Sequence, residues 1–139
     1  MHVLVPIDDS DPAREAFERA ITTAPDAAIT ALHVVEPSVA AYRSDDGPYG
    51  VQLPVTAEAD HLEAVFDPVR ALASEHDVSL TTEVLVGSPA RSIVDVATEA
   101  DVDRIVIGSH GRTGVSRVLL GSVAERVVRR APVPVTVVR

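Results

Sequence analysis

The sequence alternates short apolar segments with amphipathic ones along its whole length, and this alternation restricts the folds open to it. The apolar segments have the length and near-continuous hydrophobicity of buried strands, at residues 3–7, 28–35, 79–86, 104–107 and 133–138. Between them, apolar residues recur at helical spacing near residues 11–24, 62–73, 89–97 and 122–130. Such a βαβαβαβαβ order predicts a parallel sheet covered by helices on both faces. We therefore expect one α/β domain of 139 residues, a three-layer sandwich with five parallel strands and four helices.

The composition excludes several kinds of chemistry. The chain has no cysteine and no lysine, because all 12 basic residues are arginine. The missing cysteine excludes disulfides, thiolate metal sites and cysteine nucleophiles. The missing lysine excludes Schiff-base catalysis and the phosphate-binding lysine of P-loop proteins. No apolar run approaches the roughly 20 residues of a membrane span, and Met1 leads straight into the first strand, so we expect a cytoplasmic protein.

The charge balance is strongly acidic. The 21 Asp and Glu residues outnumber the arginines and give a net charge of −9. Such a surface repels phosphate backbones and anionic membranes, and aromatic residues are only 3% of the chain, so we expect neither nucleic acid nor membrane as a partner. Two explanations of the acidic, lysine-free composition stay open. One is adaptation to high salt, which screens repulsion between carboxylates; the other is a GC-rich genome.

The loop after the fourth predicted strand is the candidate ligand site. In open parallel sheets, ligands bind beyond the carboxyl ends of the strands. The loop after the first strand, Asp8-Asp9-Ser10, has no glycine and is not a dinucleotide fingerprint. Glycines occur instead after the fourth strand, and they let backbone N–H groups approach an anion closely; they are Gly108, Gly111, Gly114 and Gly121.

Gly121-Ser122 opens the last predicted helix, whose N-terminus favours an anion through its dipole. Arg112 and Arg117 add cationic donors to this predicted phosphate cradle. A structural explanation fits the same residues. Gly108 and Gly111 could serve only as turn residues, and Ser122 with Glu125 could form a capping box.

The glycine spacing also matches a known motif. Gly108-x2-Gly111-x9-Gly121-Ser122 agrees with G-x2-G-x9-G-[ST] at every defined position. With the V-P-I-D opening, the His33-Val34 strand end, the V-x-x-G-S-P-A segment at 84–90 and the closing P-V-P-V, the chain resembles the universal stress protein family from end to end, in its ATP-binding branch. The resemblance implies a Rossmann-like sheet, of the adenine nucleotide alpha hydrolase type, with strand order 3-2-1-4-5. With the acidic composition, it points to a haloarchaeal source.

The resemblance implies that ATP binds at the carboxyl ends of the strands, with Mg or Mn bridging its phosphates. Residues at matching positions would surround the base and ribose (Pro6, Asp8, Val34), the sugar (Ile107, Gly108) and the phosphates (Gly111, Gly121, Ser122, Val123). Ile7, His110 and Arg112 lie among these positions and complete the predicted site. The resemblance also implies a homodimer in which the last strand, residues 133–138, pairs across a two-fold axis. It supplies no catalytic residue and no metal ligand from the protein.

The roles of single residues follow from their neighbours. Asp11 with Pro12 should cap the first helix, which leaves Asp8 available to a ligand. His110 is a candidate acid or base, although neither a carboxylate nor a nucleophile is evident beside it. The other histidines lack metal-ligand spacing: His33 should pack near the sheet end, and His2, His61 and His76 should lie at the surface.

Three functions stay open at this stage. The chain could be a nucleotide-binding stress or signalling protein, a slow ATPase or phosphotransferase, or an interaction module with a vestigial site. The complete motif argues against an empty site. Efficient phosphoryl transfer depends on positioned cations, and the chain has no lysine and no evident general base. We expect nucleotide binding with at most slow hydrolysis.

Overall fold

Five parallel strands form one sheet in the order β3-β2-β1-β4-β5. The computed structural model describes residues 1–36, 55–110 and 120–139, without the side chains of 55–60. The strands are β1 (His2–Pro6), β2 (Ala28–Val35), β3 (Leu80–Val86), β4 (Arg104–Gly108) and β5 (Val135–Val138). The described residues also form four helices, α1 (Asp11–Thr23), α3 (Val55–Glu75), α4 (Pro89–Glu99) and α5 (Ser122–Arg130). The predicted α/β fold and its strand order are confirmed.

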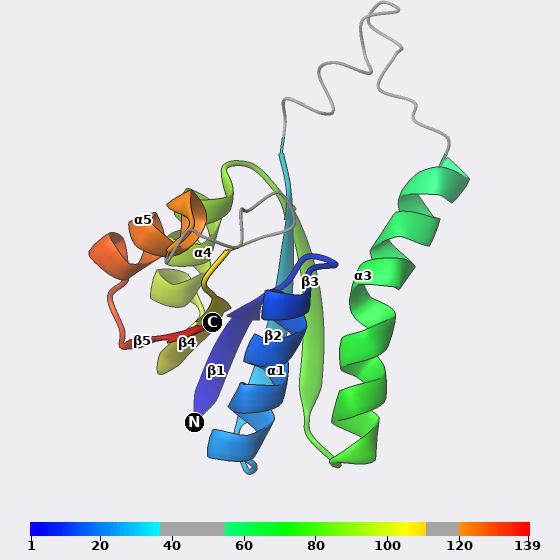
Figure 1. Ribbon diagram of the computed structural model, residues 1–139, viewed down its shortest axis with the longest axis horizontal. Coiled ribbons are helices and arrows are strands. Elements are labelled where there is room, and N and C mark those ends of the chain that lie inside the picture. The colour runs from blue at the N-terminus through cyan, green and yellow to red at the C-terminus, as the bar shows by residue number, and fades with distance from the viewer. Residues whose placement is uncertain (37–54, 111–119) are drawn as a thin grey trace, which may run out of the picture.

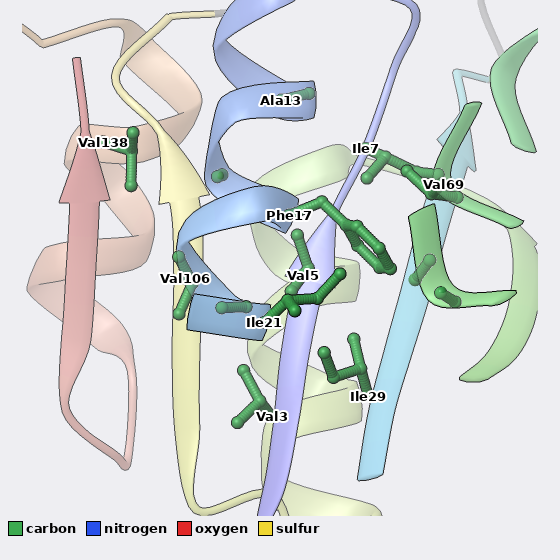
Figure 2. Close-up of a cluster of buried hydrophobic side chains, with 14 of the residues drawn as sticks. Val3, Val5, Ile7, Ala13, Phe17, Ile21, Ile29, Val69, Val106 and Val138 are labelled. Atoms are coloured by element: carbon green, nitrogen blue, oxygen red, sulfur yellow. The ribbon is translucent and has the colours of Figure 1, made fainter. Parts of the chain in front are cut away.

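The sheet separates two hydrophobic cores. Successive residues of a strand point to opposite faces, so Val3 and Val5 of β1 face α1 and α3 whereas Leu4 faces α4 and α5. On the first face, the Phe17 side chain of α1 is fully buried and lies among Val5, Ile7 and Val69 (Figure 2). The two helix pairs cover the two faces as the outer layers of the sandwich (Figure 1). This packing holds the carboxyl ends of the strands in a fixed arrangement.

Two helices start differently from the prediction. The N-cap of α1 is Ser10, whose hydroxyl accepts a hydrogen bond from the Ala13 N–H at 3.3 Å; Asp11 is the first helical residue, so its predicted capping role is wrong. The N-cap of α5 is Gly121, and no side chain of the described residues caps that helix. The predicted capping box is therefore absent, and Glu125 instead pairs with Arg129 at 2.8 Å.

His2 lies in a hydrogen-bonded position rather than at the open surface as predicted. Its Nδ1 lies 3.2 Å from the carbonyl oxygen of Ala100, and its Nε2 lies 2.7 Å from the Thr30 hydroxyl. The His2 backbone N–H donates to the Asp103 carboxylate at 2.7 Å. These contacts fasten β1 to β2 and to the α4–β4 turn. They lie at the amino end of the sheet, opposite the predicted ligand site.

Candidate functional site

The strand order reverses between β1 and β4, and most of the predicted site residues lie there. From β1 the chain builds β2 and β3 on one side of the sheet, whereas β4 and β5 lie on the other. The carboxyl ends of β1 and β4 therefore form the switch point at which such sheets bind ligands. The residues around it are Pro6, Ile7 and Asp8 at the end of β1, Val34 near the end of β2, and Ile107, Gly108 and His110 at the end of β4. Gly111 and Arg112 lie outside the described residues.

Asp8 shapes the turn between β1 and α1. Its Oδ1 accepts a hydrogen bond from the Ser10 N–H at 3.0 Å and another from the Ser10 hydroxyl. Ser10 in turn caps α1, so Asp8 orients the residue that begins this helix. The prediction separated Asp8 from helix capping, and the structure corrects this. Asp8 is only partly buried, so its carboxylate still borders the switch point.

Ile7 is fixed by β2 on both sides of its backbone. Its N–H donates to the Leu32 carbonyl at 2.8 Å, and its carbonyl accepts from Nδ1 of His33 at 3.0 Å. The Ile7 side chain is buried in the core. Ile7 thus holds the end of β1 in place, and His33 packs near the sheet end as predicted, although it was not among the candidate site residues. Its sequence signal was a histidine inside an otherwise apolar strand.

Gly108 allows α1 to approach the end of β4. A Cβ atom at this position would lie 2.8 Å from the backbone carbon of Pro12 and 2.9 Å from its carbonyl oxygen. No side chain fits there without moving the start of α1, because real Cβ contacts of this kind are essentially absent from folded proteins. Packing between α1 and β4 therefore requires a glycine at this motif position, and this requirement holds whether or not Gly108 also contacts a ligand.

Ser109 connects three elements at the edge of the candidate site. Its N–H donates to the Val138 carbonyl at 2.7 Å, and its carbonyl accepts from the Gly121 N–H at 2.5 Å. Its hydroxyl lies 3.1 Å from Nδ1 of His110. The hydroxyl that sequence reasoning did not see beside His110 is thus present. Because Ser109 is only 2% exposed, it orients the imidazole rather than acting as a nucleophile.

The start of α5 has the properties of an anion site. Its first helical hydrogen bond runs from the Glu125 N–H to the Gly121 carbonyl, so the N–H groups of residues 122–124 have no partner within the helix. A Cβ at Gly121 would lie 3.1 Å from both the Cα of His110 and the Ser109 carbonyl oxygen. Ser122 is exposed, and within the described residues its hydroxyl makes no hydrogen bond that would compete with a ligand. Backbone donors, a hydroxyl and the positive end of the helix dipole therefore meet next to His110.

Comparison with known proteins shows the family to which the chain belongs. The model of the universal stress protein family matches residues 1–139. The chain belongs to the universal stress protein family. Universal stress protein MJ0531 of Methanocaldococcus jannaschii is 37% identical over 139 residues, which cover 99% of this chain and 81% of that protein.

Solved universal stress proteins have the same fold as this one. UspA from Lactobacillus plantarum superposes with a TM-score of 0.78 at 32% identity, covering 100% of this chain and 97% of that one. The protein from Archaeoglobus fulgidus solved in complex with dAMP has a TM-score of 0.72 at 22% identity, over 100% of this chain and 98% of that one. Other solved universal stress proteins of this fold contain cAMP or AMP.

A shallow, solvent-open hollow adjoins the site of this universal stress protein. It lies between the β1–α1 turn and α3, and its lining includes Asp8, Asp9, Arg14 and Pro68. It faces α3 and not the start of α5, so it is separate from the candidate phosphate position. Across the described ranges, no group of three acidic or histidine side chains could hold a metal ion, and no helix is long and apolar enough to cross a membrane.

Proposed function

We propose that this universal stress protein binds an adenine nucleotide, specifically ATP, and that nucleotide occupancy controls a stress-response or signalling role. The observation that carries the proposal is the start of α5. There a glycine N-cap, backbone N–H groups that have no partner within the helix, and an exposed serine hydroxyl adjoin the end of β4. Adenine nucleotides in solved proteins of the same fold support the choice of ligand class.

The predicted site residues divide into two groups in this proposal. The phosphates would be held by the backbone N–H groups at the start of α5 and by the Ser122 hydroxyl, with His110 beside them and Gly111 and Arg112 completing the loop. The base and ribose would lie against Pro6, Asp8 and Val34, with Ile107 and Gly108 on the sugar side. Hydrogen bonding and helix dipoles thus replace the phosphate-binding lysine that the chain lacks.

Mg or Mn would be bound through the nucleotide and not through a protein cage. The described residues contain no acidic or histidine cluster that fits a resident metal ion. A divalent ion on the phosphate oxygens would neutralise part of their charge, which matters in a protein of net charge −9. Metal dependence is therefore expected for ATP and weaker for AMP, which has a single phosphate.

Assembly and environment complete the proposal. β5 is an edge strand, so residues 133–138 could pair with a second copy across a two-fold axis to form a homodimer. The acidic, lysine-free composition supports a protein of a salt-rich cytoplasm, as in a haloarchaeon.

Calorimetry in molar salt tests the nucleotide proposal. The folded protein is titrated with ATP, ADP, AMP and cAMP, each with and without Mg²⁺ or Mn²⁺, and with GTP as the base control. We expect adenine nucleotides to bind and GTP to bind more weakly. Release of inorganic phosphate, measured in the same samples, separates binding from turnover. If no adenine nucleotide binds, the assignment fails and the interaction-module alternative replaces it.

A further inference from the structure

Positive charge is concentrated at one end of this acidic chain. Residues 105–139 contain six arginines and one acidic residue, a net charge of +5. Residues 1–104 contain six arginines and twenty acidic residues, a net charge of −14. Within this positive segment, α5 and β5 lie at one edge of the sheet (Figure 1). A uniform acidic surface would explain solubility, but it does not explain this separation of charge.

The arginines of α5 form one exposed face. Arg126, Arg129 and Arg130 are exposed and spaced by three and four residues, so they lie on the same side of the helix. We call this group the α5 arginine face. Glu125 pairs with Arg129 at 2.8 Å. Within the described part of the chain, no carboxylate lies within ion-pair distance of Arg126 or Arg130, although acidic residues outnumber arginines.

Helix stability explains only part of this face. Arg129 and Arg130 lie in the last turn of α5, where a positive charge interacts favourably with the helix dipole by about 0.3–1 kcal/mol. Arg126 lies in the middle of the helix and gains little from that effect. We propose that the α5 arginine face is a docking surface for an acidic segment of a partner protein, one rich in Asp and Glu. This proposal does not depend on nucleotide binding.

The chemistry of the face favours protein carboxylates over a nucleic acid. Arginine binds a carboxylate through two parallel hydrogen bonds, and three arginines on two turns match closely spaced acidic side chains. The rest of the chain is strongly acidic, and α4, which packs against α5, carries exposed Asp95 and Glu99, so a long polyanion would meet negative charge outside the face. Repulsion there disfavours nucleic acid.

Fluorescence polarisation with a labelled peptide of Glu-Asp-Leu repeats tests the proposal. We expect the peptide to bind at about 0.05 M salt and to bind more weakly as the salt rises toward about 0.5 M. The attraction between arginines and carboxylates is electrostatic, and the screening length falls from about 14 Å to about 4 Å over this range. Changing Arg126→Gln together with Arg130→Gln should weaken binding at least about tenfold. The matched control is Arg19→Gln with Arg91→Gln, which removes the same charge from exposed positions on α1 and α4 and should bind like the parent.

Three results would overturn the proposal. The first is equal binding by the two double variants, which would show that only net charge matters. The second is tighter binding of a single-stranded or duplex oligonucleotide than of the peptide, lost in the α5 variant. The third is a low-salt oligomer seen by sedimentation in the parent but not in the α5 variant, which would make a second copy the occupant. Calorimetry with ATP on the same variants keeps the two proposals separate, because neither pair alters the predicted nucleotide residues.

Discussion

The Nδ1 atom of His33 lies 3.0 Å from the carbonyl oxygen of Ile7, just beyond the last residue of β1. Because a carbonyl only accepts, Nδ1 carries the hydrogen. The same ring meets the rings of His61 and Phe66 edge-on, with centroids 5.6 Å and 6.4 Å away. His33 therefore links the strand end that precedes Asp8 to helix α3.

Replacing His33 by Ala should lower both stability and nucleotide affinity. The change removes a buried ring and leaves the Ile7 carbonyl without its side-chain donor, which together should cost about 2–4 kcal/mol in unfolding free energy. Urea denaturation measures the loss of unfolding free energy. Calorimetry with ATP, on folded protein without denaturant, measures the nucleotide affinity. His61→Ala is the control, because His61 is less buried and should cost less. Equal costs at both positions would contradict a special role for the His33–Ile7 bond.

Gly108 and Gly87 differ in what an added methyl group would contact: backbone atoms at Gly108 and a side chain at Gly87. Gly108→Ala places a methyl group against the Pro12 backbone at 2.8–2.9 Å, and the start of α1 must move to admit it. We expect a loss of about 1–3 kcal/mol by urea denaturation. In Gly87→Ala the methyl group meets only the Ser92 hydroxyl at 2.8 Å, a side chain that can rotate away. That variant should lose less than about 1 kcal/mol. A smaller loss at Gly108 than at Gly87 would show that α1 adapts freely.

Two serines at helix starts should behave differently. Ser10 caps α1 through its hydroxyl, so Ser10→Ala should cost about 1 kcal/mol in unfolding free energy. Ser122 is the first residue of α5 and caps nothing, so Ser122→Ala should change stability by less than about 0.5 kcal/mol. If its hydroxyl holds phosphate, the same variant should bind ATP about tenfold more weakly.

The two measurements on Ser122→Ala separate structure from ligand binding. A stable variant with unchanged ATP affinity would show that the phosphates lie away from this hydroxyl. A destabilised variant would show that Ser122 supports α5 in a way that the hydrogen bonds do not reveal. Ser122 is also a cleaner probe than Gly121, where a Cβ would lie 3.1 Å from backbone atoms of Ser109 and His110, so that these residues would have to shift by a few tenths of an ångström.

The fold was predictable because it rests on periodic burial. Strands covered on both faces appear as continuous apolar runs, and the order of strands and helices then leaves few topologies open. The helix starts were less predictable, since Ser10 and Asp11 are both good N-cap residues and only the backbone angles distinguish them. The same holds at Gly121 and Ser122, where the motif identified the loop but not which residue begins the helix.

The contacts that support the site depend on distant parts of the chain. His33 reaches Ile7 because β2 pairs with β1, and Gly108 meets Pro12 because α1 crosses the end of β4. Neither distance follows from local sequence, because each is set by how whole elements pack. His2 shows the same limit at the other end of the sheet, where its ring bonds to groups 28 and 98 residues away in the chain.

Stability should rise with salt. The net charge of −9 makes carboxylate repulsion the largest long-range term. The described residues show only two arginine–carboxylate pairs, one within α3 and one within α5, and both are exposed. Salt also screens these ion pairs, but this removes little stability, because each exposed pair contributes about 0–1 kcal/mol to the unfolding free energy. The screening length falls from about 30 Å at 0.01 M to about 3 Å at 1 M, so repulsion is lost over this range. A net gain of about 1–2 kcal/mol would raise the Tm by roughly 3–7 °C.

Charge-neutralising substitutions identify screening as the cause. Glu18→Gln, Asp26→Asn and Asp95→Asn change exposed side chains that make no ion pair among the described residues. Together they should raise the Tm in dilute buffer and flatten its dependence on NaCl, because less repulsion remains to be screened. Sodium sulfate at matched ionic strength separates this effect from salting-out of apolar surface, which sulfate strengthens more than chloride. A Tm that does not change with NaCl would reject high-salt adaptation and leave genome composition as the reason for the missing lysine.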